Sequence, residues 1–353
     1  MKKIIALFFG LSLAIIATAQ PANYYNSANG LTGDQLKVAL HNIIKGHTSI
    51  SYAQLWNAFW STDNKGNGIV WDMYSDNPNG TPPYIYHLGD DQCGNYSGEG
   101  DCYNREHSWP SSWFNDQNTP RTDLHHIFPT DGYVNNRRGN YAFGEVRSAS
   151  WTSRNGSKLG TCKTPGFTGT VFEPIDEYKG DFARAIMYMS VRYYSEDSGW
   201  GSSDMTTKSE IKSWAIDLLL RWNELDPVSE KEKERNEAIY NDYQHNRNPF
   251  VDHPEYARMI WDPSWHAVEE VQEAVYLFPN PLEAGQTLHV SGNCNSFDAI
   301  AICDLCGHTL LKASGHAVGD FAVTLPNGFA KGCYIVKLMR NGSVVKYEKL
   351  LVK

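Results

Sequence analysis

The sequence lacks any long apolar run beyond its first residues. Residues 4–17 are apolar apart from one glycine and one serine, and they lie between Lys2-Lys3 and the small-residue segment Ala17-Thr18-Ala19. A helical membrane span needs about 20 apolar residues, so this stretch is too short, whereas its flanks are typical of a secretory signal peptide. We therefore expect residues 1–19 to be a signal peptide that is removed on export, and no membrane span in the remainder.

Positive charge is also scarce. The 31 Lys and Arg residues against 40 Asp and Glu residues give a net charge of −9, which becomes −11 once Lys2 and Lys3 are removed. Such a balance argues against a protein that coats nucleic acid through its overall charge. Within residues 105–158, however, seven basic residues outnumber five acidic ones. This local excess predicts a modest basic cleft.

Cysteine is sparse as well, with seven residues in the chain, so at least one is unpaired. Export would place them in an oxidising compartment, and Cys93 and Cys102 flank a Gly-rich loop where a disulfide is a reasonable expectation. Cys162 has no partner nearby in the sequence. The Cys303-x-x-Cys306 pattern is compatible with redox or metal chemistry. With no second such pair in a β-rich region, an ordinary disulfide or buried thiols are favoured.

Helical patterns occur in the first part of the chain, on both sides of an irregular centre. Capping boxes are indicated by Thr32-x-x-Gln35, Ser51-x-x-Gln54 and Ser229-x-x-Glu232. Apolar spacing predicts helices that begin at the first two boxes, and further helices over residues 181–194, 207–225 and 229–243. We expect a strand over residues 69–74. Residues 87–175 are expected to be irregular, as loops that carry function often are.

The chain changes character near residue 276 and becomes β-rich. Strands are predicted over residues 287–290, 299–303, 309–312, 321–325, 334–339 and 344–352. Asn341-Gly342 predicts a tight hairpin turn between the last two. The fold class that follows is α+β, with a mainly helical domain over residues 20–265 and a small all-β sandwich over residues 276–353.

The residues suited to catalysis are concentrated between positions 104 and 145. They include the adjacent pair Glu106-His107 and a second group at residues 123–140. Hydrolysis of a phosphodiester needs a base for the attacking water, and neutral His titrates in the right range. It also needs a hard cation held by oxygen ligands and a cationic clamp on the phosphate. This part of the sequence contains all of these residue types.

The spacing predicts how these residues are arranged. Residues 103–108 and 124–128 are expected to form two strands, and Thr130 to cap a short helix over residues 133–138. Side chains alternate between the faces of a strand, so Glu106 and His107 converge on one spot only at a strand end or a bulge. Asn135 would then come from the helix.

Several separated blocks resemble the endonuclease I family. They are residues 105–107 (REH), 123–132 (DLHHIFPTDG), 135–141 (NNRRGNY), 182–190 (FARAIMYMS) and 245–251 (HNRNPFV). The resemblance covers about residues 30–262. It implies a secreted or periplasmic nuclease with a ββα-metal (His-Me finger) core, one Mg²⁺-type ion (Mn²⁺ or Ca²⁺ being alternatives) and products with 5′-phosphate ends.

Carried over by position, the resemblance makes His107 the general base and Glu106 and Asn135 the metal ligands. Arg138 aligns as a catalytic group, although a structural role is open, and Arg121 is a looser candidate for the phosphate clamp. Further residues that could line the site are His125, His126, Asn140 and Arg105. One of the two adjacent histidines should point toward the cleft, and Asn140 could instead end the helix. Zinc remains an alternative because of the histidines.

The tail resembles the type A C-terminal sorting domain of type IX secretion. The residues that carry this resemblance are 277–281 (LFPNP), Gly332-x-Tyr334 and the Lys-rich terminal hairpin. It implies that the type IX machinery exports the chain through the periplasm to the cell surface or the medium.

The sequence thus predicts a monomeric, secreted, non-specific endonuclease that acts on DNA, with RNA left open as a further substrate. No helix-turn-helix or zinc-finger pattern offers base-specific readout. Two alternatives stay open. One is a secreted ribonuclease of the same family, and the other is a catalytically degenerate nucleic-acid-binding protein on the cell surface.

Overall fold

The computed structural model describes residues 20–262, 276–291, 297–305, 307–314, 321–340 and 343–353. The expected signal peptide, the Asn341-Gly342 turn, Cys294 and Cys306 lie outside these ranges. The chain divides into two units, Met1–Trp265 and His266–Lys353. Within the described ranges, no helix is long and apolar enough to cross a membrane.

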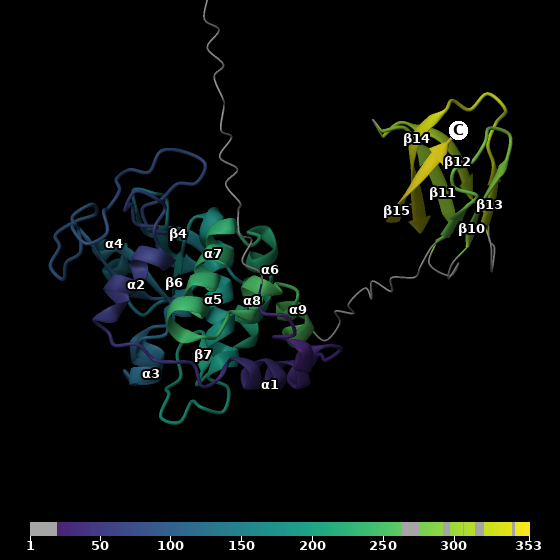
Figure 1. Ribbon diagram of the computed structural model, residues 1–353. Coiled ribbons are helices and arrows are strands. Elements are labelled where there is room, and N and C mark those ends of the chain that lie inside the picture. Colours follow the sequence, from purple (N-terminus) through teal and green to yellow (C-terminus); the bar gives the residue numbers. More distant parts are fainter. Residues whose placement is uncertain (1–19, 263–275, 292–296, 306, 315–320, 341–342) are drawn as a thin grey trace, which may run out of the picture. The chain divides into compact units, whose positions relative to one another are not determined.

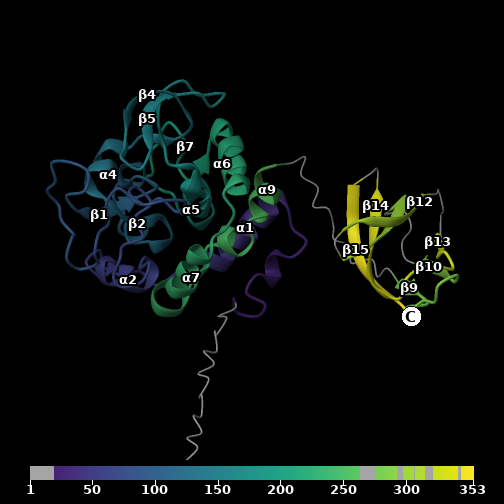
Figure 2. The ribbon, with the colours of Figure 1, turned by 90° about the horizontal axis from the view of Figure 1, so that it is seen from above.

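Unit 1 is organised around helix α5 (Lys179–Arg192), whose 14 residues are all buried. It lies in the middle of the unit in both ribbon views (Figures 1 and 2). Helices α1 (Gly33–Ile44) and α6 (Ser213–Leu225) pack against it. The other α-helices of this unit are α2 (Gln54–Thr62), α3 (Asn118–Arg121), α4 (Gly132–Arg138), α7 (Glu230–Ala238), α8 (Pro249–Asp252) and α9 (Tyr256–Trp261).

The helix predictions hold best where the apolar spacing is longest. α1, α2 and α5 form close to the predicted ranges, and the predicted capping box at Ser229 forms in full. Thr32 precedes α1, but its side chain makes no capping bond. The helix expected from residue 207 begins at Ser213, because two short strands, β7 (Thr206–Thr207) and β8 (Glu210–Ile211), precede it. The helix expected to reach residue 243 changes after α7 to the π-helix η5 (Ile239–Gln244).

The centre of unit 1 is less irregular than the sequence suggested. Four strands form a sheet in the order β3-β6-β5-β4, and they are β3 (Ala142–Phe143), β4 (Val146–Thr152), β5 (Lys158–Cys162) and β6 (Thr170–Glu173). The prediction of a strand over residues 69–74 is wrong. That segment makes isolated bridges at Ile69 and Val70 and then turns.

A disulfide joins Cys93 to Cys102, as expected. The carbonyl oxygen of Cys102 also accepts a hydrogen bond from the backbone N–H of Gly132, at 2.9 Å. The loop that ends at this disulfide is therefore attached to the first residue of α4. Cys162, Cys303 and Cys333 are free thiols.

Unit 2 is all-β in its described part, as predicted. One sheet has the order β13-β10-β9 and the other β12-β11-β14-β15. The strands are β9 (Tyr276–Phe278), β10 (Thr287–Ser291), β11 (Ala299–Cys303), β12 (Thr309–Ser314), β13 (Phe321–Thr324), β14 (Gly332–Arg340) and β15 (Ser343–Val352). Apolar residues such as Leu288, Ile300 and Val336 form its own core.

Candidate active site

The catalytic candidates lie on two antiparallel strands and the helix that follows them. Strand β1 (Tyr103–His107) pairs with β2 (Ile127–Asp131), with Glu106 opposite Phe128 and His107 opposite Ile127. Helix α4 begins directly after β2 and packs against both strands. The predicted order of strand, loop, strand and helix is therefore present. The second strand begins three residues later than predicted, after a 3-10 turn at Leu124–His126.

The helix is capped by a different residue from the one predicted. Asp131, not Thr130, precedes α4, and its Oδ1 accepts the N–H of Val134 at 2.8 Å. A carboxylate at this position satisfies a free N–H of the first turn and also favours the helix dipole. This cap fixes where α4 begins, and therefore also the position of Asn135, which is the residue after Val134.

Strand β1 presents different side chains to its two sides. It pairs with β2 in regular register at all five positions, so neighbouring residues alternate as in any strand. Asn104 and Glu106 contact residues of α4, whereas Arg105 and His107 contact Tyr52. Glu106 and His107 thus have separate surroundings, and no bulge brings them together.

Glu106 is a buried carboxylate held by two neighbours. Its Oε1 lies 3.0 Å from Nη1 of Arg138 and accepts a 2.9 Å hydrogen bond from the Tyr74 hydroxyl. Burial raises the pKa of Glu106 to about 7, although Arg138 and Tyr74 both act to lower it. Oε2 is left for a further partner.

Arg138 is buried with its guanidinium turned toward the end of β1. Its Nη1 donates to the carbonyl of His107 at 2.8 Å, and its Nη2 donates to the carbonyl of Ser108 at 2.5 Å. Arg138 therefore holds three acceptors, which are the Glu106 carboxylate and these two carbonyl oxygens. These contacts use three of the five N–H groups of the guanidinium, while its Nε is buried without a hydrogen-bond partner among the described residues.

Asn135 faces Asn104 across the junction of α4 and β1. Its Nδ2 donates to Oδ1 of Asn104 at 2.7 Å, and Asn135 is half-buried. Because the amide nitrogen is engaged, its Oδ1 is left as an acceptor on the side of the strand that carries Glu106. Asn140, which follows the end of the helix, is exposed.

The His107 ring is oriented by a backbone carbonyl. Its Nε2 lies 3.1 Å from the carbonyl oxygen of Arg121. A carbonyl only accepts, so Nε2 carries the proton and Nδ1 is the unprotonated nitrogen. Burial, together with the neighbouring His126, lowers the pKa of His107 to about 3. The imidazole is therefore neutral over the whole physiological range.

Two arginines lie over the ring of Tyr52 beside His107. The guanidinium carbons of Arg105 and Arg121 are 3.6 Å and 4.5 Å from its centroid. Tyr52 itself stacks on His107, with ring centroids 6.2 Å apart and an interplanar angle of 18°. In the described part of the chain, neither arginine forms an ion pair with a carboxylate. This side of β1 thus carries unneutralised positive charge.

His125 and His126 are both buried, and His125 lines a small cavity together with Arg184 and Glu232. The Nε2 atom of His126 lies 2.6 Å from the carbonyl of Pro120, and its ring centroid is 5.6 Å from that of His107. The corresponding nitrogen of His125 faces the carbonyl of Asn246 at 3.1 Å.

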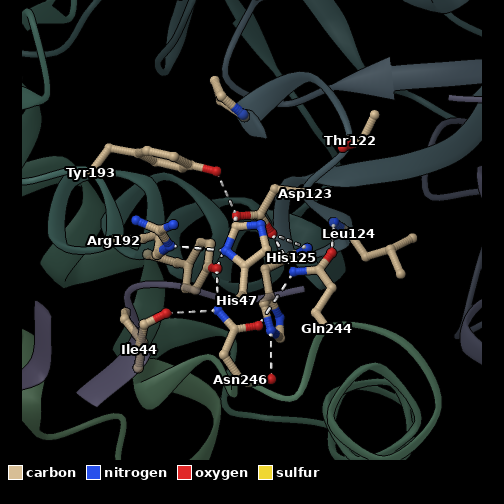
Figure 3. Close-up of polar contacts among 12 residues, drawn as sticks. Ile44, His47, Thr122, Asp123, Leu124, His125, Arg192, Tyr193, Gln244 and Asn246 are labelled. Carbon is tan, nitrogen blue, oxygen red and sulfur yellow. Dashed lines mark hydrogen bonds and ion pairs between the residues drawn. The ribbon is translucent and has the colours of Figure 1, made fainter. Parts of the chain in front are cut away.

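A buried carboxylate, Asp123, organises the turn that precedes β2 (Figure 3). Its Oδ1 accepts the N–H of His125 and the amide of Gln244, and its Oδ2 accepts the hydroxyl of Tyr193. Burial alone would raise the pKa of Asp123, but His47 and the adjacent histidines outweigh it and hold the pKa below its usual range. This network ties the turn to the C-terminal end of α5 and to the last residue of η5.

Sequence reasoning missed the residues that position the site. They are Asn104, Tyr74, Tyr52 and Asp123. Asn104 could have been found, because it lies two positions before Glu106 and strand alternation puts both on one face. The tyrosines come from loops with no distinguishing pattern.

The model of the family described as Endonuclease I matches residues 32–255, which include every residue of the site. The chain belongs to the endonuclease I family. Members of this family are nucleases, and this chain is one as well.

Two of the relatives cover most of the chain, and a third covers a smaller part. An extracellular ribonuclease of Bacillus amyloliquefaciens is 42% identical over 262 residues, which are 71% of this chain and 82% of that protein. An extracellular ribonuclease of Bacillus subtilis (strain 168) is 40% identical over 266 residues, which are 71% of this chain and 84% of the relative. A protein named endonuclease-1 from Buchnera aphidicola is 27% identical over 131 residues, 37% of this chain and 44% of its own length.

Proposed function

We propose that the chain is a secreted, divalent-metal-dependent endonuclease that hydrolyses phosphodiester bonds of RNA and DNA with little sequence preference. The observation that carries the proposal is the pairing of a buried carboxylate and an amide oxygen on one side of β1 with a neutral imidazole at its end. The names of the Bacillus relatives support RNA as a substrate. The family description supports endonucleolytic cleavage.

The side chains around Glu106 fit a Mg²⁺-type ion. Oε2 of Glu106 and Oδ1 of Asn135 are hard oxygen donors, and the other polar atoms of both side chains are engaged by the protein. Mg²⁺ keeps several waters, so two protein ligands are enough, and Mn²⁺ or Ca²⁺ would use the same donors. A bound ion would neutralise charge that develops on the phosphate and on the leaving oxygen.

His107 would take the proton from the attacking water through Nδ1. Its Nε2 proton is held by the Arg121 carbonyl, which fixes the tautomer and the plane of the ring. The lowered pKa of His107 ensures that the imidazole is unprotonated when substrate binds. Attack of that water on phosphorus would break the P–O3′ bond, so that the 3′ oxygen, once protonated from solvent, leaves as a hydroxyl and the other product carries a 5′-phosphate end.

Arg121 and Arg105 are the best candidates for contact with the substrate phosphates. Their charges are adjacent to His107 and have no carboxylate partner among the described residues. Arg138 has a different role in this proposal, because its contacts with Glu106 and two carbonyls make it a positioning residue. His126, His125 and Asn140 would contribute packing or helix termination.

We further propose that the chain acts outside the cell. The relatives are named extracellular ribonucleases, and the all-β unit 2 is separate from the residues matched by the family model. Unit 2 would be the signal for the type IX machinery, with transit through the periplasm. We expect a chain that lacks residues 276–353 to remain inside the producing cell.

Initial rates on matched single-stranded RNA, single-stranded DNA and duplex DNA test the nuclease proposal. We expect hydrolysis with Mg²⁺ and none in EDTA. His107→Ala should lose at least about 100-fold in rate, whereas His308→Ala, at an exposed histidine of unit 2, should match the parent. Full activity in EDTA would refute the metal-dependent mechanism, and activity on RNA alone would narrow the function to a ribonuclease.

A further inference from the structure

A hollow of about 350 Å³ opens next to the His107 ring. One wall is the segment before α2, with Ser49, Ile50, Ser51 and Tyr52, and the other is α3 and the residue after it. Two of its lining residues touch the catalytic imidazole, since Tyr52 stacks on the ring and the Arg121 carbonyl faces Nε2. The volume is within the range of sites that hold small organic molecules.

The walls of this hollow carry hydrogen-bonding groups and one source of positive charge. Asn118, Thr119, Ser49 and Ser51 are exposed and offer amide and hydroxyl groups, while Arg121 is half-buried. No acidic side chain is among the lining residues. An anionic ligand with polar edges and a flat ring would satisfy all of these groups.

Arg121 links the hollow to the charged side of β1. Its guanidinium lies over Tyr52 together with that of Arg105, and the Arg105 Nε is buried with no partner. Two guanidinium groups that lie near one ring and have no carboxylate partner among the described residues can together bind a phosphate. A phosphate held there would place its attached nucleoside at the mouth of the hollow.

We propose that this hollow is a subsite for one unpaired nucleotide of the substrate strand, so that the enzyme selects single-stranded nucleic acid. The inference rests on the proposed nuclease function. The base would lie against Ile50 and Tyr52, with its edge toward Asn118 and Thr119 and its phosphate on Arg121. Contact with the flat face of a base does not depend on which base it is, which agrees with shallow sequence preference.

A duplex cannot use the hollow without disruption. Its bases are stacked and paired, and turning one out costs a few kcal/mol. A single strand has no pairing to lose, so it gains the subsite contacts in full. The ratio of single-strand to duplex affinity is therefore the quantity that reports on the hollow.

Binding in EDTA tests the subsite separately from hydrolysis. The probes are a fluorescent oligouridylate and a duplex DNA of equal length, with Kd measured by anisotropy on the full chain. Thr119→Trp fills the hollow at an exposed position whose side chain makes no hydrogen bond with the described residues. We expect its Kd for the single strand to rise roughly tenfold, since each stacked base contributes about 1–3 kcal/mol. The Kd for the duplex should rise much less, so the preference for single strands should shrink.

Thr168→Trp is the matched control, because Thr168 is an exposed threonine in the loop between β5 and β6. Asn118→Ala is a milder second variant, expected to weaken single-strand binding severalfold. An unchanged single-strand Kd in Thr119→Trp, or an equal loss for the duplex, would overturn the subsite. Failure of the parent to cleave any nucleic acid with Mg²⁺ would instead refute the nuclease function, so the two outcomes are distinct.

Discussion

Replacing Arg138 with methionine should destabilise unit 1 by about 3–5 kcal/mol at pH 8, the typical cost of leaving a buried charge unpaired. Methionine keeps most of the buried volume but removes the ion pair with Glu106 and the hydrogen bonds to the carbonyls of His107 and Ser108. The Glu106 carboxylate would keep only the Tyr74 hydroxyl. The cost therefore comes from the group left behind as much as from the bonds lost.

The same substitution should make the destabilisation depend on pH. The pKa of Glu106 in the folded protein is already about 7, above its ordinary value of 4.5, and Arg138 is the stronger of the two groups that lower it. Without Arg138 the pKa rises further, so the folded variant holds a proton that the unfolded chain has lost. The free energy of unfolding of the variant therefore falls as pH rises through the pKa that Glu106 has in the folded state. The deficit should be smallest near pH 5 and largest above pH 8.

Urea unfolding followed by tryptophan fluorescence measures this effect in the full chain. All 11 tryptophans lie at or before residue 265, so the signal reports unit 1 and is silent on unit 2. Arg138→Met with Glu106→Gln is the informative double variant. A neutral amide removes the unpaired charge, and we expect about 2 kcal/mol or more to be recovered relative to Arg138→Met.

Two results would refute the reasoning. One is an Arg138→Met variant within about 1 kcal/mol of the parent at pH 8, which is the size of an ordinary substitution. The other is a double variant no more stable than Arg138→Met. Unchanged stability with a raised KM would instead mean that Arg138 clamps substrate phosphate.

Three further predictions follow from buried or capping groups. Asn135→Ala should raise the Mg²⁺ concentration for half-maximal activity by about 10-fold or more, as a lost second ligand would; an unchanged Mg²⁺ dependence would exclude Asn135 as a ligand. Asp72 is buried beside Asp131, and burial and that carboxylate raise its pKa to about 8. Because a raised carboxyl pKa stabilises the folded state less as pH rises, the free energy of unfolding of the parent should fall by about 3 kcal/mol more between pH 5 and pH 8 than that of Asp72→Asn. Urea unfolding at both pH values measures this difference, and an equal fall in the two proteins would contradict the raised pKa of Asp72. Ser229→Ala removes the capping box of α7 and should cost about 1 kcal/mol, and an unshifted urea midpoint would show that η5 compensates.

The sequence predicted the elements whose patterns are long and regular. In α5 and in the strands of unit 2, apolar residues recur at the spacing of a helix or of a strand over enough residues that another secondary structure does not fit them. The sheet formed by β3–β6 was missed because β4 has one buried residue followed by exposed ones, and β3 is two residues long. Such strands are specified by partners distant in sequence, which local patterns do not contain.

The candidate site shows the same division. The strand, loop, strand and helix order was predicted and is present, and His107 is the last residue of β1. Which histidine would face the cleft could not be derived, because the answer depends on Asp123 and on partners more than 60 residues away in the sequence. The burial of Arg138 likewise depends on how α4 packs on β1.

The Cys93–Cys102 disulfide has a consequence for where the segment before β1 reaches its full stability. It closes a short loop immediately before β1, and the Cys102 carbonyl is bonded to the first residue of α4. Closing such a loop stabilises the folded state by about 2–3 kcal/mol. In a reducing cytoplasm this contribution is absent at the strand that carries Glu106 and His107. Under the proposed export, the bond would form outside the cytoplasm, so the segment before β1 would reach its full stability only there.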